Sequence, residues 1–255
     1  MRRTLALSLA LSLSLGLLSG CGPAAPAVQA QELTAQPVSV QPAGSPAVDQ
    51  ALTSFGLSLL QSAREAESGP VLLSPLSAAL ALSMAANGAD GDTLAQFETV
   101  LGGGVTLDEL NAACAQLLSD YGDLDGSTEC LIANSLWTDP EGMIREDFIG
   151  KCQGIFDAQV FSQDLSAPSV VPAVNGWVSE HTNEMIPNIL SEPFNENAAL
   201  LLVNALYLNN TWETEFDPNN TYLRGFYHQG SHKESMDFLN AGFVTFPYLQ
   251  SETAQ

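Results

Sequence analysis

Few side chains in this sequence have the types and spacing that catalysis or metal binding requires. His228 and His232 could hold a metal only if their segment were helical, and Gly230 between them favours strand and turn. His181, the remaining histidine, is a further candidate for a general base or a metal ligand. No serine lies in a Gly-x-Ser-x-Gly turn, and carboxylate pairs are too common here to indicate glycosidase chemistry. The sequence therefore predicts no enzyme, no metal and no cofactor.

One cysteine belongs to a targeting signal. Cys21 follows a basic start, Met1-Arg2-Arg3, and an apolar run of Leu, Ser and Ala, which is the pattern of a signal peptide. A transmembrane anchor is the alternative, but the run is short and interrupted by serines. Small residues that end on a cysteine resemble the bacterial lipoprotein signal. We therefore predict a signal peptide over residues 1–20, lipid attachment at Cys21, and a membrane partner at the cell surface.

The other three cysteines are Cys114, Cys130 and Cys152. Their odd number permits at most one internal disulfide, and their spacing lacks the short pairs of a zinc site. Apolar neighbours surround each of them, which favours buried free thiols over a bridge. Both alternatives remain open at this point.

Composition and charge define the domains and exclude one class of partner. The net charge of −22 disfavours nucleic acid, because binding phosphate requires Lys and Arg. A hydrophobic content of 45% supports a folded core. Residues 21–45 are rich in Pro and Ala and nearly uncharged, so we expect a flexible tether there. One folded domain is predicted over residues 46–255.

The elements of that domain are organised around residues 198–208, an apolar run that contains one amide, Asn204. The run predicts a strand covered on both faces in the middle of a large sheet. A buried helix is the alternative, but charged and amide residues on either side limit the run to strand length. A buried amide without partners costs about 1–3 kcal/mol, so Asn204 must find hydrogen-bond partners.

Hydrophobic periodicity and capping residues place the other elements. Ser74-Pro75 predicts the start of an apolar helix that lies beneath the sheet. Capping boxes are expected at Asp92 and at Thr106 with Glu109, and the three glycines of residues 102–104 predict a turn. The predicted helices are residues 47–66, 76–86, 93–101, a segment from 106, 144–156 and a segment from 169, and the further strands are residues 71–73, 130–138 and 158–164.

Several of these segments resemble one family. Leu202-Val-Asn-Ala-Leu-Tyr-Leu-Asn-Asn-Thr-Trp-Glu213 resembles the central strand of the serpins, the large family of protease inhibitors. Further collinear matches, which extend the resemblance over about residues 53–226, are residues 72–82, 86–93, 133–137 and 175–187. The resemblance implies an α+β, serpin-like fold in which helices pack on a large mixed β-sheet, with the start of a second sheet.

The resemblance also implies roles for individual residues. Ser74, Ser77 and Asn204 match a polar cluster called the shutter, beneath the sheet where it opens, and we expect Asn204 to bond the two serines. Trp212 matches a tryptophan at the breach, where the family's reactive-centre loop first enters the sheet. In the family, a target serine or cysteine protease cuts this loop, which then inserts as a new strand.

The sequence departs from the family at its C-terminal end. It stops at Gln255, after residues that resemble the start of the second sheet, and no residue matches the reactive-centre loop. We therefore expect an incomplete fold, the N-terminal part only, whose complete form inhibits proteases outside the cell. The alternative is a non-inhibitory surface lipoprotein that uses the scaffold for binding.

Overall fold

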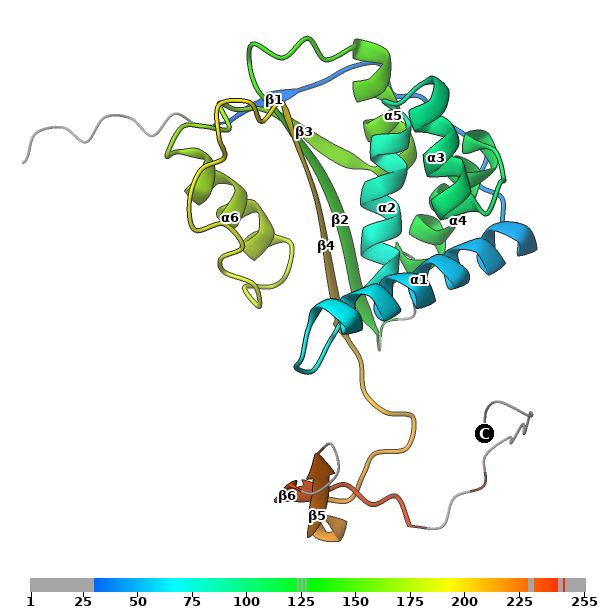
Figure 1. Cartoon of the computed structure of the whole chain (residues 1–255), viewed down its shortest axis with the longest axis vertical. Coiled ribbons are helices and arrows are strands. Elements are labelled where there is room, and N and C mark those ends of the chain that lie inside the picture. Colours follow the sequence, from blue (N-terminus) through cyan, green and yellow to red (C-terminus); the bar gives the residue numbers. More distant parts are fainter. Residues whose placement is uncertain are drawn as a thin grey trace, which may run out of the picture.

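A four-stranded sheet lies between one helix on one face and several helices on the other (Figure 1). The computed structural model describes residues 30–122, 124, 126, 128–228, 232–242 and 245. The helices are α1 (Pro46–Ala66), α2 (Pro75–Ala86), α3 (Gly91–Gly102), α4 (Leu107–Gly122), α5 (Glu146–Phe156), α6 (Val170–Glu180) and the short 3-10 helix η1 (Pro218–Asn220). The strands are β1 (Gln31–Leu33), β2 (Glu129–Thr138), β3 (Ala158–Ser162), β4 (Leu200–Asn209), β5 (Tyr222–His228) and β6 (His232–Phe238).

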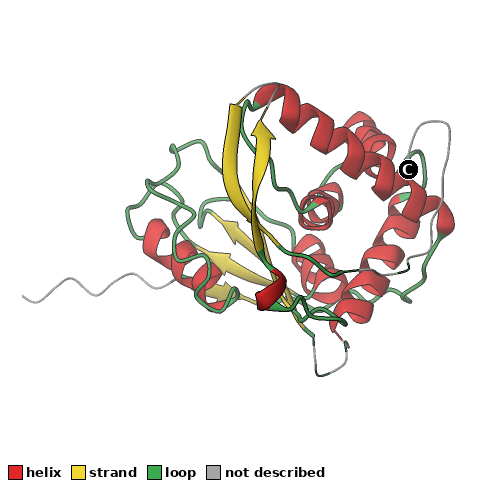
Figure 2. Cartoon of the chain, turned by 90° about the horizontal axis from the view of Figure 1, so that it is seen from below, coloured by secondary structure: helices red, strands yellow, loops and turns green. Residues whose placement is uncertain are grey.

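The sheet is mixed, with strand order β1-β3-β2-β4. β3 runs parallel to β2, whereas β4 and β1 run antiparallel to their neighbours. β5 and β6 form a separate hairpin beyond the end of β4, the second small sheet that the resemblance implied (Figures 1 and 2). The α+β prediction with a large mixed sheet and the start of a second one is confirmed.

Alternation along the strands divides the core into two layers. Leu136, Val160 and Leu202 point to the face covered by α2 and its neighbouring helices. Trp137 and Val203, one residue further along their strands, point to the face covered by α6. The prediction that β4 is covered on both faces is therefore confirmed.

Local sequence signals explain where the helices begin. Ser74 caps α2, and its side chain accepts a hydrogen bond from the amide of Ser77. The capping box at the start of α4 is also confirmed, because Glu109 Oε2 accepts bonds from both the amide and the hydroxyl of Thr106. The start predicted for α3 is wrong: Asp90 is the cap, and its carboxylate accepts from the amide of Gly91.

The strand predicted over residues 71–73 does not form. In the described part of the chain no strand pairs with this segment, and a strand needs a neighbour to satisfy its backbone groups. Leu72 is 98% exposed as a result. The segment borders a groove with α1, lined by Leu57 and Leu60.

Residues 30–44, which we call the strap, lie against the folded part, where the sequence predicts a flexible tether. β1 pairs antiparallel with β3, and Leu33, Ala35 and Val40 pack on the larger core cluster. The tether prediction is therefore wrong for these residues, and the folded part begins before Pro46. Residues 1–29, which include the predicted signal peptide and Cys21, lie outside the described residues.

Two glycines of α5 make room for the strap. A Cβ atom on Gly150 would collide with the carbonyl oxygen of Gln36, and one on Gly154 would collide with the backbone of Val38. The amide of Val38 donates to the carbonyl of Gly150 at 2.9 Å. The backbone of the strap thus lies directly on the backbone of α5, which only residues without a side chain permit.

Candidate functional site

The region where the sheet was expected to open consists of β4, the helix start beneath it and the residues that follow it. β4 pairs with β2 over its whole length, from Leu200 with Thr138 to Asn209 with Glu129. The other edge of β4 carries no strand in the part of the chain that the structure describes. The prediction of a strand is confirmed, but its interior position is wrong, because β4 is the edge strand of this sheet.

Asn204 has a different partner from the one expected. Its side-chain amide donates to Oδ1 of Asn134, directly opposite on β2, at 2.8 Å. Asn134 in turn donates to the carbonyl of Phe156, at the end of α5, at 2.8 Å. No bond from Asn204 to Ser74 or Ser77 exists among the described residues, and Oδ1 of Asn204 is buried without a partner there. The expected hydrogen bond to the serines is therefore wrong.

The two serines bond to each other instead. The hydroxyl of Ser77 donates to the hydroxyl of Ser74 at 2.9 Å, and both belong to the first turn of α2. α2 packs against β4, and Asn204 lies on the same strand face as Leu202, which contacts the α2 side of the core. The structure thus places the three predicted shutter residues on facing elements. Ser74 and Ser77 bond to each other, and Asn204 bonds to Asn134. Their role in opening the sheet stays a prediction.

Asn134 is the residue of this region that the sequence analysis did not single out. It is buried, and it joins β4, β2 and α5 through its two side-chain bonds. A second asparagine in an apolar strand was a signal that could have identified it. An amide side chain withdrawn from water needs a hydrogen-bond partner, and an amide on the paired strand can supply one.

Trp212 lies three residues beyond Asn209, the last residue of β4, which pairs with Glu129 at the end of β2 that β3 does not reach. It is 70% exposed, and its ring meets that of Phe216 edge to face at 5.5 Å. No sheet strand covers it among the described residues. The breach role implied by the resemblance stays a prediction.

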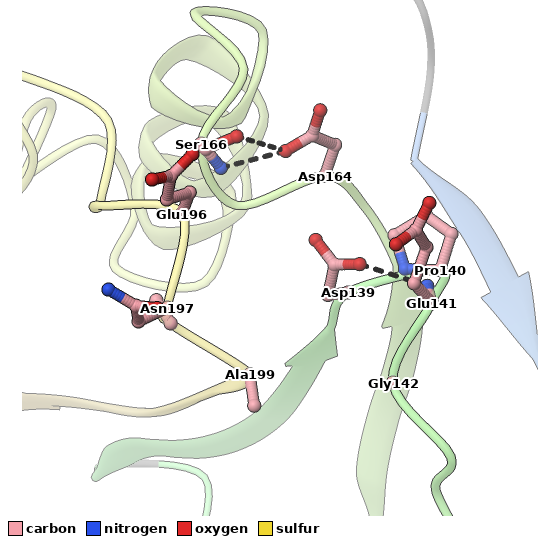
Figure 3. A pocket seen from close by; sticks show the side chains of 10 residues that line it. Asp139, Pro140, Glu141, Gly142, Asp164, Ser166, Glu196, Asn197 and Ala199 are labelled. Carbon is pink, nitrogen blue, oxygen red and sulfur yellow. Dashed lines mark hydrogen bonds between the residues drawn. The ribbon is translucent and has the colours of Figure 1, made fainter.

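An acidic pocket of about 480 Å³ lies at the opposite end of the sheet, where β2 and β3 end and β4 begins (Figure 3). Asp139 and Asp164 follow the two strands, and Glu196 precedes β4. Asp164 accepts bonds from the hydroxyl and the amide of Ser166, which hold the pKa of its carboxyl below the usual value. Asp139 likewise accepts from the amide of Glu141. Asp139 and Asp164 therefore stabilise the turns that follow β2 and β3.

The cysteines do not form a reactive site. Cys114, Cys130 and Cys152 are all free, so the prediction of free thiols is confirmed and the alternative of one bridge is not, but the predicted burial is confirmed only for Cys114 and Cys152. Burial raises the pKa of Cys114 to about 11 and that of Cys152 to about 12. Cys130 is only half-buried, and this partial burial also raises the pKa of its thiol. Thiols with raised pKa values are poor nucleophiles, because the thiolate is the reactive form.

One histidine lies at the end of α6 and the other two lie in the β5–β6 hairpin. His181 bonds the carbonyl of Trp177 through Nδ1 at 2.7 Å and stacks on the ring of the same tryptophan. His228 pairs with His232 in the β5–β6 hairpin, so both lie in strands, as expected, and not in a helix. Within the described residues, no three His, Cys, Asp or Glu side chains gather to hold a metal ion, and no helix has the length and apolarity to cross a membrane.

Comparison with known proteins gives a consistent result. The family model described as "Serpin (serine protease inhibitor)" matches residues 50–255. Iripin-8 of Ixodes ricinus is 30% identical over 219 residues, which cover 78% of this chain and 54% of that protein. Neuroserpin of Gallus gallus is 34% identical over 169 residues, which cover 64% and 40%. The chain thus spans about half the length of the curated relatives it matches.

Solved structures agree with these relatives. The native state of tengpin, a thermophilic serpin, superposes with a TM-score of 0.73 at 28% identity, covering 83% of this chain and 55% of that one. The latent state of the same protein gives a TM-score of 0.70 at 27% identity, with coverage of 78% and 54%.

Proposed function

The chain belongs to the serpin family, and we propose that its complete form is an exported protease inhibitor rather than an enzyme. The family supplies a protease-inhibitor scaffold. The finer proposal is that the target is a serine or cysteine protease and that inhibition proceeds by insertion of a reactive-centre loop.

One observation carries the proposal: within the described residues, no strand pairs with the edge of β4 that faces away from β2. β4 is long, its partner β2 satisfies one edge only, and helices cover both of its faces. An edge of this kind accepts an extended segment through main-chain hydrogen bonds, and reactive-loop insertion in serpins is one instance of such strand addition.

The division of chemistry follows from this architecture. The target protease supplies the nucleophile and forms an acyl bond to the loop that it cuts. The inhibitor supplies an edge on which the cut loop pairs as a new strand, and the free energy of that pairing displaces the bound protease. None of the thiols or histidines described above has a part in these steps.

We also propose that the protein is held at the cell surface by a lipid on Cys21. The support is the sequence pattern of residues 1–21, and these residues lie outside the described part of the chain. Mass spectrometry of the mature N-terminal peptide tests the lipid directly, and Cys21→Ala should release the protein from the membrane.

The test of inhibition uses the product of the whole reading frame, whether it ends at Gln255 or continues. This product is incubated with trypsin-, subtilisin- and papain-like proteases, and each mixture is separated under denaturing conditions. A covalent adduct that resists denaturant supports inhibition, and the same protease with its nucleophile blocked serves as the control. Cleavage without an adduct by all three proteases would contradict the proposal and favour a surface lipoprotein that only binds.

A further inference from the structure

We propose that the strap orients the folded part on the membrane, with the β2/β3 end of the sheet toward the bilayer and the Trp212 end away from it. This inference rests on the proposed lipidation of Cys21. The partner is a lipid bilayer that holds the acyl chains of that residue.

The first step of the argument is that the strap is fastened. Its amide at Ala35 donates to Oε1 of Gln153 at 2.9 Å, and Nε2 of the same glutamine donates to the carbonyl of Leu33 at 3.0 Å. The strap continues across α5 at Val38 and reaches α4, where the amide of Ala43 donates to the carbonyl of Ala112. These bonds, together with β1, fix the strap along its length.

The second step is that the chain between the lipidated Cys21 and the strap, which we call the leash, is short. Cys21 and Ala30, the first described residue, are nine residues apart, which is at most about 30 Å of extended chain. A leash that ran unattached to Pro46 would reach about 85 Å. The strap therefore reduces the reach of the leash about threefold.

The third step is the place where the leash meets the sheet. Gln31 pairs with Ser162, the last residue of β3, and Ser162 pairs with Thr138, the last residue of β2. The opposite end of the sheet, with Glu129 and Asn209, is about 30 Å away along strands of ten residues. Figure 1 shows β1 at one end of the sheet and the β5–β6 hairpin beyond the other.

The fourth step concerns charge at the near end. The pocket there carries Asp139, Glu141, Asp164 and Glu196 (Figure 3). Four carboxylates repel anionic headgroups over roughly the Debye length of 10 Å, so this end does not adhere to an anionic surface. The leash and the repulsion act in opposite directions, and together they keep the near end close to the bilayer without docking.

The experiment compares two matched labels on the lipidated full chain in vesicles that contain anionic lipid and an acceptor lipid dye. Glu196→Cys labels the near end and Glu213→Cys the far end, each in a Cys130→Ser background, because Cys114 and Cys152 are buried. Both sites are exposed, and both changes remove one negative charge. Energy transfer to the bilayer should be at least roughly two-fold higher from position 196, given the separation of the two ends.

Two variants test whether the strap causes this difference. An insertion of roughly sixteen Gly and Ser residues after Val28 restores the long leash and should bring the ratio of the two transfer values close to one. Gly154→Ala, which removes the room for Val38, should shift the ratio in the same direction, and Gly176→Ala should not.

The outcomes separate the two proposals. Equal transfer from the two labels in a protein with acylated Cys21 would overturn the orientation and leave the anchor standing. Absence of the acyl mass, with the protein remaining in solution, would overturn both. A ratio that survives the insertion would show that something other than the strap sets the orientation, and would also overturn the inference.

Discussion

The side chain of Asn204 on β4 donates to Asn134 on β2, which donates onward to the last carbonyl of α5, at Phe156. This relay crosses the sheet at the point where the fold was expected to rely on serines. It makes Asn134 the more important of the two asparagines, because Asn134 serves two partners and Asn204 only one.

Asn134→Ala should therefore destabilise the protein more than Asn204→Ala. The first change leaves two buried groups without partners and should lower the free energy of unfolding by about 2–4 kcal/mol, whereas the second should cost about 1–2 kcal/mol. Urea unfolding of the two variants measures the difference. A larger loss for Asn204→Ala would mean that the orphaned Oδ1 of Asn204 has a partner that the relay does not include.

Gly154→Ala should detach the strap. The added Cβ would collide with the carbonyl oxygen of Val38, and backbone cannot yield as a flexible side chain would. Hydrogen exchange at the amide of Val38, which is protected by Gly150, should accelerate at least tenfold. The control is Gly176→Ala on α6, because no atom lies within 4 Å of a Cβ added there. This change should leave the exchange rate of Val38 unchanged and stabilise α6 slightly.

Of the three described cysteines, only Cys130 should be accessible to a thiol reagent in the native protein. Burial raises the pKa of Cys114 to about 11 and of Cys152 to about 12, so both remain protonated and inaccessible near pH 8. Cys130, half-buried at the start of β2, should react first with an aromatic disulfide reagent. Reaction of all three at equal rates in the folded protein would contradict the buried placement.

The same two thiols predict a loss of stability in base. Their ordinary pKa is 9.0, and it is raised in the folded state, so the unfolded chain ionises first as the pH increases. The stability they contribute is fully present below pH 9 and declines as the pH rises toward 11 and 12. Unfolding midpoints measured across this range should fall, and they should fall less in a Cys114→Ala, Cys152→Ala double variant.

The pKa of Glu109 should lie below the usual value for a glutamate. Hydrogen bonds from the amide and the hydroxyl of Thr106 lower the pKa of its carboxyl, so the cap is complete above the usual glutamate pKa and is lost as the pH falls through the folded value. NMR titration should show this shift, and Thr106→Val, which removes the hydroxyl alone, should reduce it. An unshifted Glu109 in the parent chain would argue against the capping box.

The parts of the fold that were predictable from sequence are those whose signals are local. The strand at residues 200–209, the apolar helix after Ser74 and the capping box at Thr106 each follow from periodicity or from residues within one turn. The family resemblance added their order in space. Together these gave the sheet, its helices and the elements that carry the candidate site.

What could not be predicted depends on contacts between distant segments. The partner of Asn204 is 70 residues away, and finding it requires the register of β2 against β4. The strap was missed because its composition suggests a tether. Its backbone packs against Gly150 and Gly154, which lie more than a hundred positions later in the sequence. Residues 71–73 have strand composition but no neighbour to pair with in the described chain.

The glycine pair in α5 also affects the order in which the protein is built. Each glycine weakens an isolated helix by about 1 kcal/mol, so α5 on its own is a poor helix. The strap that rests on it leaves the ribosome more than a hundred residues earlier, as the separation of Ala35 from Gln153 shows. During synthesis the strap is therefore complete before the helix surface on which it packs has been made. Closure of the N-terminal strap becomes one of the last events of folding, after the helices beneath it have assembled.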